Sequence, residues 1–284
     1  MTSKVVSLTD AVAVVRDDSH LALTGFAITR NSIAAAHALI RSGRRGLHLS
    51  QVIGGMETDL LAGAGCLSRL TYSGGSLDRF GPLHAVNRAI VDGSLAVAEY
   101  SSLALTMRFH AAGLGLPYLP ARTMLGSDLL EPLLSSGDVR LAEDPFDGGP
   151  IVQLSPLRPD VTVVHTDVAD TAGNAVVSGP MWALRETAFA ATTVVVTCEE
   201  LVPEGSLDPN MVAIPAAIVD AVSLVPSGAH PTALHRRYDY DRTHLQDYAV
   251  AARASGDAHA AYLEKFVLGS DDHAAYMDLI GVSP

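Results

Sequence analysis

The chain has 284 residues, of which 48% are hydrophobic, 18% are charged and only 5% are aromatic. Such a length and composition are typical of a globular α/β enzyme with a large core, and they exclude a disordered or fibrous protein. A net charge of −12 argues against nucleic acid or an anionic membrane surface as the main partner.

The two cysteines, Cys66 and Cys198, lie far apart in apolar segments. Their spacing matches neither a metal site nor a disulfide framework, which fits a reducing compartment. The 11 histidines show no metal-ligand spacing either, so we expect no metal. The N-terminal segment lacks the apolar core of a secretory signal, and no apolar run is long enough to span a membrane. We therefore predict a cytoplasmic protein with no membrane partner.

Short strands alternate with helices in the first part of the chain. The patterns predict a helix from Ser7 to about Val15, strands at 20–23, 47–53, 67–72 and 94–99, and helices at 33–44, 83–91 and 101–112. This alternation predicts a parallel sheet with helices outside it. The turns after the strands, at Gly25, Gly54–Gly55, Ser73–Ser76 and Glu99–Ser101, should then lie along one edge, where open α/β sheets bind ligands.

Prolines interrupt this pattern from Leu116 to Pro120, and 122–127 has the composition of a loop. Acidic, glycine-rich and proline-rich residues from Gly137 to Pro159 predict an excursion from the sheet that could form a small hairpin. We find no internal repeat and no linker that would separate two domains. The sequence therefore predicts a single domain over residues 1–284.

The most informative stretch runs from Val161 to Gly179. Apolar, β-branched residues occupy consecutive positions at its start, which is typical of a strand buried on both faces and ending near Thr166. Gly173–Asn174 predicts a tight turn, and 175–178 a returning strand. A buried strand can end in histidine and aspartate only if those side chains are hydrogen-bonded, because burying them unpaired is costly.

After Gly179 the chain again alternates predicted helices and strands, and it ends in helices. We expect a helix at 181–191, a strand at 193–197, irregular structure at 203–215, an apolar β-rich segment at 216–225, a turn at 226–231 and amphipathic helices from 244 to 280. The predicted fold class is α/β, with an open, mostly parallel sheet flanked by helices and a helical C-terminal tail.

Five pieces of sequence carry a family resemblance. They are TGFAITRNS near Gly25, EYSSLALTMRFHAAGLGLPYLP from Glu99, VHTDVADTAGN, VVVTCEE, and VDAVSLVPSGAHP followed by YDYD. Their order, over nearly the whole chain, resembles the α subunit of class I coenzyme A transferases of the glutaconate CoA-transferase type. The resemblance implies an open α/β fold, a homologous β subunit in a heterodimer or α2β2 assembly, and a reaction on acyl-CoA thioesters.

The resemblance also implies how the chemistry is divided. In such transferases the covalent nucleophile is a glutamate of the β subunit, so this chain would close the acyl pocket and supply backbone donors. Coenzyme A thioester and a small, possibly dicarboxylic, acid would be substrates, with no permanently bound cofactor. Gly25–Phe26 matches the family's Gly-Gly-Phe loop, with Thr24 in place of its first glycine.

Glu99 is the candidate catalytic residue for an alternative function. In a related branch of ring-opening CoA-thioester hydrolases, the acid that begins the EYSS-like segment does the catalytic work, and a further branch contains a CoA-dependent decarboxylase. At a strand-to-helix junction, Glu99 could act as a general acid or base. It could equally complement the dipole of the following helix.

The predicted substrate contacts lie in the same turns. They are Gly25, Phe26, Arg30, Gly54, Gly55, Ser73, Ser76 and Ser101. Ser73 and Ser76 could bind a carboxylate through hydroxyl and N–H groups, and Arg30 could pair with a carboxylate or phosphate. Simple turn chemistry for the serines and a solvated surface position for Arg30 are the alternatives.

Several other polar residues are predicted to be mainly structural. We expect His165, Asp170 and Asn174 to hold the turn after the central strand by hydrogen bonds. The pair Glu199–Glu200 resembles carboxylates for acid–base work, but the family resemblance favours a structural or interface role. His230 precedes Pro231 in a turn that could face the partner or the path of CoA. A non-enzymatic subunit that only stabilises its partner is the third hypothesis.

Overall fold

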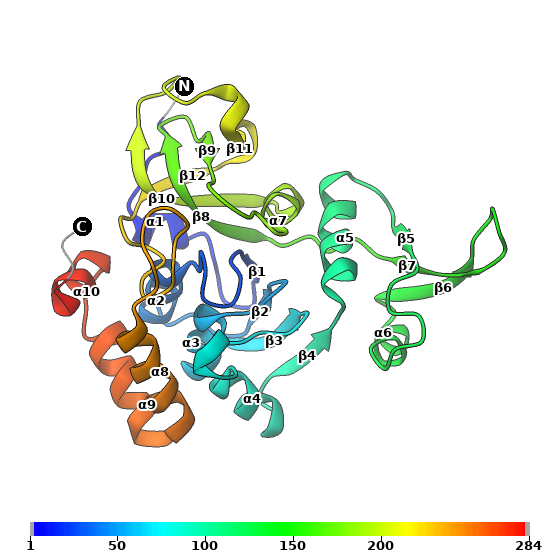
Figure 1. Ribbon diagram of the computed structural model, residues 1–284, viewed down its shortest axis with the longest axis horizontal. Helices are drawn as coiled ribbons and strands as arrows, with labels where there is room; N and C mark the ends of the chain where they lie inside the picture. The colour runs from blue at the N-terminus through cyan, green and yellow to red at the C-terminus, as the bar shows by residue number, and fades with distance from the viewer. Residues whose placement is uncertain (1–2, 282–284) are drawn as a thin grey trace.

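The computed structural model describes residues 3 to 281 and is built on a 9-stranded, mostly parallel sheet. Its strands are β1 (His20–Leu23), β2 (Leu47–Ser50), β3 (Leu67–Tyr72), β4 (Ala96–Glu99), β8 (Val161–Asp170), β9 (Ala175–Val176), β10 (Thr193–Val202), β11 (Val212–Ile214) and β12 (Ala221–Leu224). The order β11-β9-β8-β1-β2-β3-β4, with β10 between β8 and β12, places the long strand β8 at the centre (Figure 1). The predicted fold class is confirmed.

Both central strands run further than the sequence predicts. β8 continues through Asp167 to Asp170, and β10 continues through Glu199 to Val202. The predicted ends fall where the side chains turn from apolar to charged. The strands continue because Asp167 pairs with Arg30, and because Glu199 lies within hydrogen-bond distance of His165 and Tyr238.

Helices cover the sheet. Beside it lie α1 (Leu8–Val12), α2 (Ile33–Arg41), α3 (Met56–Gly63), α4 (His84–Val91), α5 (Ser102–Gly113) and α7 (Leu184–Ala190). The C-terminal tail forms α8 (Arg242–Ala254), α9 (Gly256–Leu263), a π-helical turn (Glu264–Leu268) and α10 (His273–Ile280), and α8 packs against α4. Within residues 3 to 281, no helix has both the length and the apolarity needed to cross a membrane.

Helix α3 was not predicted. Its first six residues, Met56 to Leu61, are all buried, including Glu57, Thr58 and Asp59. A helix that is buried on every side shows no amphipathic pattern, and three polar residues in its first turns hide it further. Asp59 accepts hydrogen bonds from the Val86 N–H at 2.9 Å and the Tyr248 hydroxyl at 2.8 Å, which tie α3 to α4 and α8.

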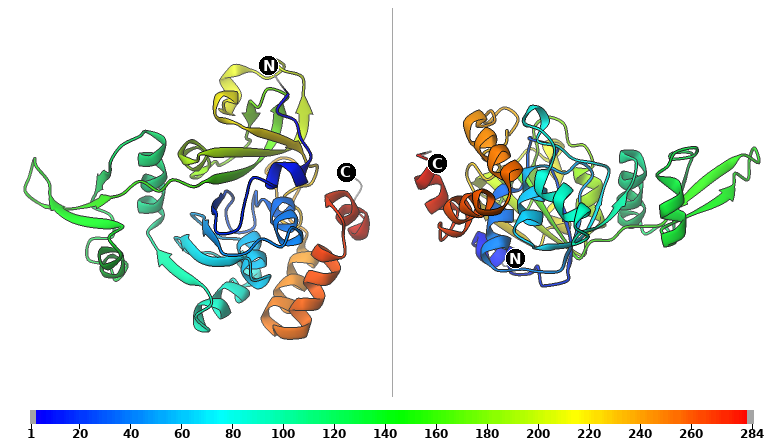
Figure 2. Two further views of the ribbon diagram at one scale, coloured as in Figure 1. Left: turned by 180° about the vertical axis from the view of Figure 1, so that it is seen from behind. Right: turned by 90° about the horizontal axis from the view of Figure 1, so that it is seen from below.

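A small lobe projects from the body, as Figures 1 and 2 show. It contains α6 (Leu130–Ser136) and a 3-stranded antiparallel sheet of β5 (Leu119–Ala121), β7 (Pro150–Leu154) and β6 (Val139–Glu143). The predicted hairpin is confirmed by the pairing of β6 with β7, whereas β5 and α6 were not predicted. Buried Arg108 of α5 anchors the lobe through hydrogen bonds to the carbonyl and hydroxyl of Ser155 and an ion pair with Asp138.

A buried ion pair joins the loop after β1 to the central strand. Arg30 Nη1 donates to Asp167 Oδ2 at 2.8 Å, and the two side chains are 1% and 2% exposed. The other guanidinium nitrogen, Nη2, donates to the carbonyl of Ser178, while the Ser178 N–H donates to Asp167 at 2.8 Å. The charged pair therefore joins the loop after β1 to β8 and to the segment at Ser178, which are 137 and 148 residues away in the sequence.

We expect the variant Asp167→Asn to lower the free energy of unfolding by about 3 to 5 kcal/mol, because it leaves the buried charge of Arg30 uncompensated. The double variant Arg30→Met/Asp167→Asn should be less destabilised than the sum of its single variants. Urea-induced unfolding of the four proteins measures both effects. The exposed pair of Arg122 and Asp144 is the control, and Arg122→Met should change stability little. A loss for Asp167→Asn no larger than that control would contradict the assignment.

Candidate active-site rim and pocket

The turns after β1, β2, β3 and β4 meet at one edge of the sheet. The four strands are consecutive parallel neighbours, so their carboxyl ends point the same way. Beyond the strands, Phe26 pairs with Ile53 and Gly54 pairs with Gly75 in parallel bridges. We call the edge formed by Gly25–Phe26, Gly54–Gly55, Ser73–Ser76 and Glu99–Ser101 the rim.

Gly25 is required by the shape of the first turn. Its φ is +131°, and a Cβ atom there would lie 2.8 Å from the carbonyl oxygen of Arg30. The turn closes through reciprocal backbone hydrogen bonds between Phe26 and Thr29, both at 2.9 Å. Phe26 stands out at the rim with 37% of its surface exposed.

The second and third turns hold each other by backbone contacts. The Gly54 N–H donates to Gly74 at 2.9 Å, and the Ser76 N–H donates to the Gly54 carbonyl at 3.2 Å. The Ser76 hydroxyl is used to accept from the Asp78 N–H at 3.2 Å. The Ser73 hydroxyl, in contrast, is buried without a hydrogen-bond partner among the described residues. Of the two serines, only Ser73 has a hydroxyl left uncommitted by residues 3 to 281, and that hydroxyl is enclosed by protein in this structure.

Glu99 and Ser101 lie at the far end of the rim. Glu99 is exposed at the end of β4, in register with Tyr72 of β3, and burial together with the charge of Glu99 raises the pKa of Tyr72. Ser101 caps α5, because its hydroxyl accepts from the Ala104 N–H at 3.1 Å and lies 2.7 Å from the Thr123 hydroxyl. Glu99 is thus open to a ligand, whereas the Ser101 hydroxyl is occupied.

Arg30 does not have the position that the sequence suggested. Its guanidinium is 1% exposed and engaged with Asp167 and Ser178, so it cannot meet a substrate anion in this structure. The sequence places a positive charge near the turn correctly, but the partner that neutralises it lies 137 residues away. We therefore leave Arg30 out of the proposed substrate contacts.

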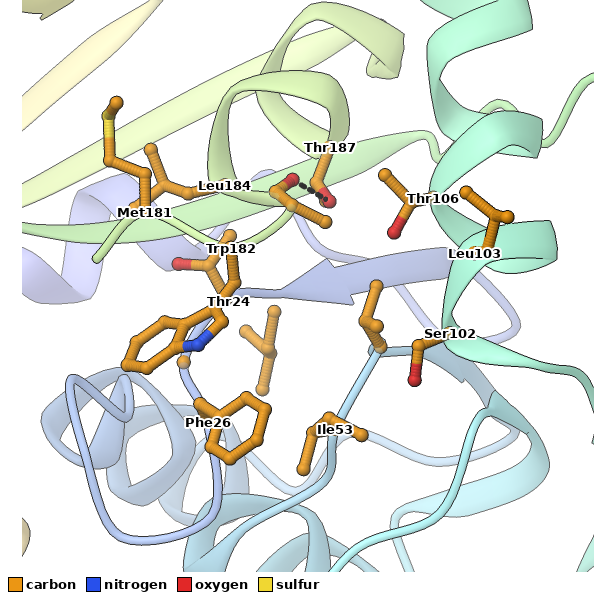
Figure 3. Close-up of a pocket in the computed structure, with 14 residues that line it drawn as sticks. Thr24, Phe26, Ile53, Ser102, Leu103, Thr106, Met181, Trp182, Leu184 and Thr187 are labelled. Atoms are coloured by element: carbon orange, nitrogen blue, oxygen red, sulfur yellow. Dashed lines mark hydrogen bonds between the residues drawn. The ribbon is translucent and has the colours of Figure 1, made fainter.

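An apolar pocket of about 250 Å³ opens beside the Gly25–Phe26 end of the rim. It is lined by Leu23, Thr24, Gly25, Phe26, Val52, Ile53, Ser102, Leu103, Thr106, Met181, Trp182, Ala183, Leu184 and Thr187. Figure 3 shows the side chains of Phe26 and Trp182 at one end, with Ser102 and Leu103 of α5 at the other. We call this cavity the rim pocket.

Trp182 and Thr24 are pocket residues that sequence reasoning missed as ligand contacts. Trp182 stacks on Phe26 with ring centroids 4.8 Å apart and an angle of 17° between the planes. The Thr24 side-chain oxygen is buried and has no partner within the described part of the chain. The single tryptophan of the chain, in the segment Gly-Pro-Met-Trp, could have been noticed as a candidate ligand contact. Its stacking partner Phe26 could not, because the two residues are distant in the sequence.

A buried polar cluster supports the rim from behind. Gln51 donates through Nε2 to Glu57, which is fully buried in the first turn of α3. A Cβ atom on Gly55 would lie 2.2 Å from the Asn31 amide nitrogen and 2.9 Å from Glu57 Oε2, so Gly55 fits only as glycine. Burial raises the pKa of Glu57 to about 7, against the opposing effect of the nearby polar side chains of Asn31 and Gln51.

The predicted roles of Asp170 and Asn174 in the turn after β8 are confirmed, whereas His165, predicted to hold the same turn, contacts Thr197 and Glu199 of β10 instead. Asp170 Oδ1 accepts from the N–H groups of Ala172, Gly173 and Asn174 at 2.9 to 3.1 Å, and Oδ2 accepts from the Asn174 side chain at 2.9 Å. His230 lies 2.9 Å from the Tyr276 hydroxyl and 3.3 Å from Asp241, which joins its turn to the C-terminal helices.

Glu199 is also buried in a complete hydrogen-bond set. Its Oε1 lies 2.8 Å from His165 Nε2 and accepts from the Tyr238 hydroxyl at 2.6 Å, and its Oε2 accepts from the Ser227 N–H at 2.6 Å. Burial alone would raise the pKa of Glu199, but the donors and the charge of His165 hold it below its ordinary value. Glu200 is more exposed and pairs with Arg237 at 3.2 Å. These contacts support a structural role for both glutamates.

Metal-binding side chains do not gather at the rim. Within residues 3 to 281 no three histidine, cysteine, aspartate or glutamate side chains come together as a possible metal site.

A family model described as Coenzyme A transferase matches residues 5–224. A 3-oxoadipate CoA-transferase subunit from Pseudomonas knackmussii is 32% identical over 96% of this chain and 97% of its own length. A glutaconate CoA-transferase subunit from Acidaminococcus fermentans is 32% identical over 99% of this chain and 93% of its own. The cholesterol ring-cleaving hydrolase IpdA subunit of Mycobacterium tuberculosis is 30% identical over 89% of each chain. The chain also spans 63% of an uncharacterized protein from Archaeoglobus fulgidus, to which it is 33% identical.

Solved structures agree with these relatives. Glutaconate coenzyme A-transferase from Acidaminococcus fermentans superposes with a TM-score of 0.92 over 98% of this chain and 93% of that chain, at 29% identity. The decarboxylase AibA/AibB superposes with a TM-score of 0.82 over 93% of this chain and 98% of that chain, at 31% identity.

Glu57 makes stability depend on pH in a direction that the structure fixes. Its folded pKa of about 7 lies above the ordinary 4.5, so the folded state holds the extra proton and stability falls as pH rises from about 4.5 to 7. Glu57→Gln removes this cost. We expect the variant to be more stable than the unaltered chain at pH 8, by up to about 3 kcal/mol, with the difference vanishing near pH 4.5.

Urea-induced unfolding at several pH values measures this difference. Glu131→Gln is the matched control, because Glu131 also lies in the first turn of a helix but is exposed. A pH-independent effect of Glu57→Gln would show that Glu57 does not titrate in this range.

Proposed function

The chain belongs to the coenzyme A transferase family, and from this we propose that it is the α subunit of a hetero-oligomeric enzyme that moves CoA from an acyl-CoA to a carboxylic acid. The observation that carries the proposal is that the rim pocket, as lined by the described residues, has no acidic, basic or thiol side chain that could act as the catalyst. Among the described residues that line the rim pocket there is no aspartate, glutamate, histidine, cysteine or lysine. The chain therefore supplies one half of a site.

The missing half is a carboxylate on a homologous β subunit. That carboxylate attacks the thioester carbonyl and expels CoA as a thiolate, which leaves an anhydride between the acyl group and the glutamate. The thiolate then attacks the glutamyl carbonyl, so that the acyl group departs as a free acid and a glutamyl-CoA thioester remains. The acceptor acid takes CoA by the reverse of these steps, in a ping-pong scheme. Relatives that are themselves named as transferase subunits are consistent with such a partner, in a heterodimer or α2β2 assembly. CoA thioester is then a substrate, and the enzyme needs no resident cofactor.

This chain's own contribution is to bind and polarise the thioester. Negative charge develops on the carbonyl oxygen when the partner's carboxylate attacks, and prearranged donors stabilise that charge. Thr24 lines the rim pocket, and its hydroxyl has no hydrogen-bond partner among the described residues, so a small rotation of its side chain would let it donate to a bound group without first breaking a bond. Gly25, Gly54 and Gly55 allow the turns of the rim to pack closely against neighbouring parts of the chain, and Phe26 borders the pocket.

The alternative is a CoA-thioester hydrolase or decarboxylase in which Glu99 is catalytic. The exposure of Glu99 at the rim favours it, as does similarity to a decarboxylase and to part of a ring-cleaving hydrolase.

For either function we propose that residues 1–284 act as one domain, because the lobe shares its apolar core with α5. The two free, buried cysteines suit work in the reducing cytoplasm.

Mass spectrometry of the complex separates the two functions. The chain is co-expressed with its β subunit, the complex is incubated with a panel of acyl-CoA esters, and the intact masses of both chains are measured. We expect a CoA adduct on the partner, and we expect Glu99→Gln to lower the rate of CoA exchange less than about tenfold.

A general acid or base contributes about 10²- to 10⁴-fold to a rate. A loss of that size for Glu99→Gln, with no adduct on either chain, would favour the hydrolase alternative instead. Glu143→Gln in the exposed strand β6 of the lobe is the control variant and should leave exchange unchanged.

A further inference from the structure

The chemistry of the rim pocket's lining restricts the acyl group. Apart from hydroxyl groups, the side chains around the pocket in the described chain are apolar, and none is charged. One of those hydroxyls, on Thr187, is already used in donating to the Ala183 carbonyl at 2.7 Å. A carboxylate entering this pocket would lose its water without gaining a cation, which is costly.

The wall made by Phe26 and Trp182 is prearranged to contact an apolar group. The two rings are stacked, and they remain 37% and 41% exposed. Trp182 has a φ of +44°, an uncommon conformation for a bulky residue that is maintained only where its surroundings impose it. Here the surroundings include Arg30, which binds the Ser178 carbonyl at the start of the segment that carries Trp182.

The pocket is small and open on one side. Small-molecule sites commonly measure about 300 to 1,000 Å³, and 250 Å³ is below that range. A volume of this size suits an acyl group better than the larger nucleotide part of CoA.

We propose that this pocket selects apolar acyl groups and rejects acyl groups that end in a second carboxylate. The inference rests on the proposed function, since it identifies the pocket as the acyl site of a CoA-dependent enzyme. It goes beyond that function because two of the relatives are named for dicarboxylic substrates, 3-oxoadipate and glutaconate.

Hexanoyl-CoA and adipyl-CoA are the matched probes, because they differ only by a terminal carboxylate. Their dissociation constants for the complex with the β subunit are measured by titration calorimetry. We expect hexanoyl-CoA to bind at least tenfold more tightly. From butyryl-CoA to octanoyl-CoA, each added methylene should strengthen binding about fourfold.

Two variants test whether the pocket itself is responsible. Leu103→Arg places a cation at the pocket from a side chain that is 59% exposed, so the fold should tolerate it, and it should reduce or reverse the preference for hexanoyl-CoA. Leu279→Arg on α10, where the side chain is 48% exposed, is the control and should leave the preference unchanged. Trp182→Ala should weaken hexanoyl-CoA binding without strengthening that of adipyl-CoA.

The failure of this inference can be distinguished from the failure of the proposed function. Equal binding of the two esters, binding of neither, or a preference that Leu103→Arg leaves unchanged would overturn the inference. Binding does not require turnover. A complex that prefers hexanoyl-CoA but never exchanges CoA with any acid would therefore support the acyl specificity and overturn the transferase function.

Discussion

The ion pair between Arg30 and Asp167 is the contact on which the geometry of the rim pocket depends. Asp167 belongs to β8, and Arg30 follows the turn that carries Phe26. Through Ser178, the same guanidinium also holds the segment that leads to Trp182. The two aromatic rings are therefore stacked because both of their backbones are attached to one buried charge. Such a pair contributes modestly to net stability, since desolvation opposes the Coulomb attraction, but it allows only one arrangement of the segments that it joins.

The rim depends on a different constraint, which is close backbone packing. Gly25 and Gly55 both lie against Asn31, so the first two turns are positioned by the same side chain, and Gly54 and Gly75 bring the third turn alongside. Side chains at these positions would separate the turns. The buried carboxyl of Glu57 supports this packing at some cost in stability, because its charged form has lost its water. The arrangement is typical of a site whose geometry is maintained at the expense of local stability.

The sequence predicted the features of the fold that depend on local residue patterns and on general rules of sheet topology. Alternating strands and helices were sufficient to place the turns after Leu23, Ile53, Tyr72 and Glu99 on one edge, because parallel strands share their carboxyl ends. The sequence did not predict contacts between residues that are far apart in the chain. The partner of Arg30 lies in another strand, the ring that stacks on Phe26 follows β9, and β8 runs past Thr166 only because Asp167 and Asp170 find partners. Helix α3 was not predicted because its polar residues are buried and so remove the amphipathic pattern.

Under the proposed function, a site divided between two chains would explain why this half is apolar. Hydrolysis would compete with the proposed transfer of CoA, because water could attack an activated acyl intermediate, so the reacting atoms should be enclosed during transfer. An open apolar pocket on one chain and a carboxylate on another achieve this only when the chains are together, since neither has a complete site alone. The exposed surfaces of Phe26, Leu103 and Trp182 then have a second use, because an apolar edge is what a partner would need to cover in order to exclude water. On this view, acyl selectivity and docking of the β subunit depend on the same side chains, and a substitution that changes one is expected to change the other.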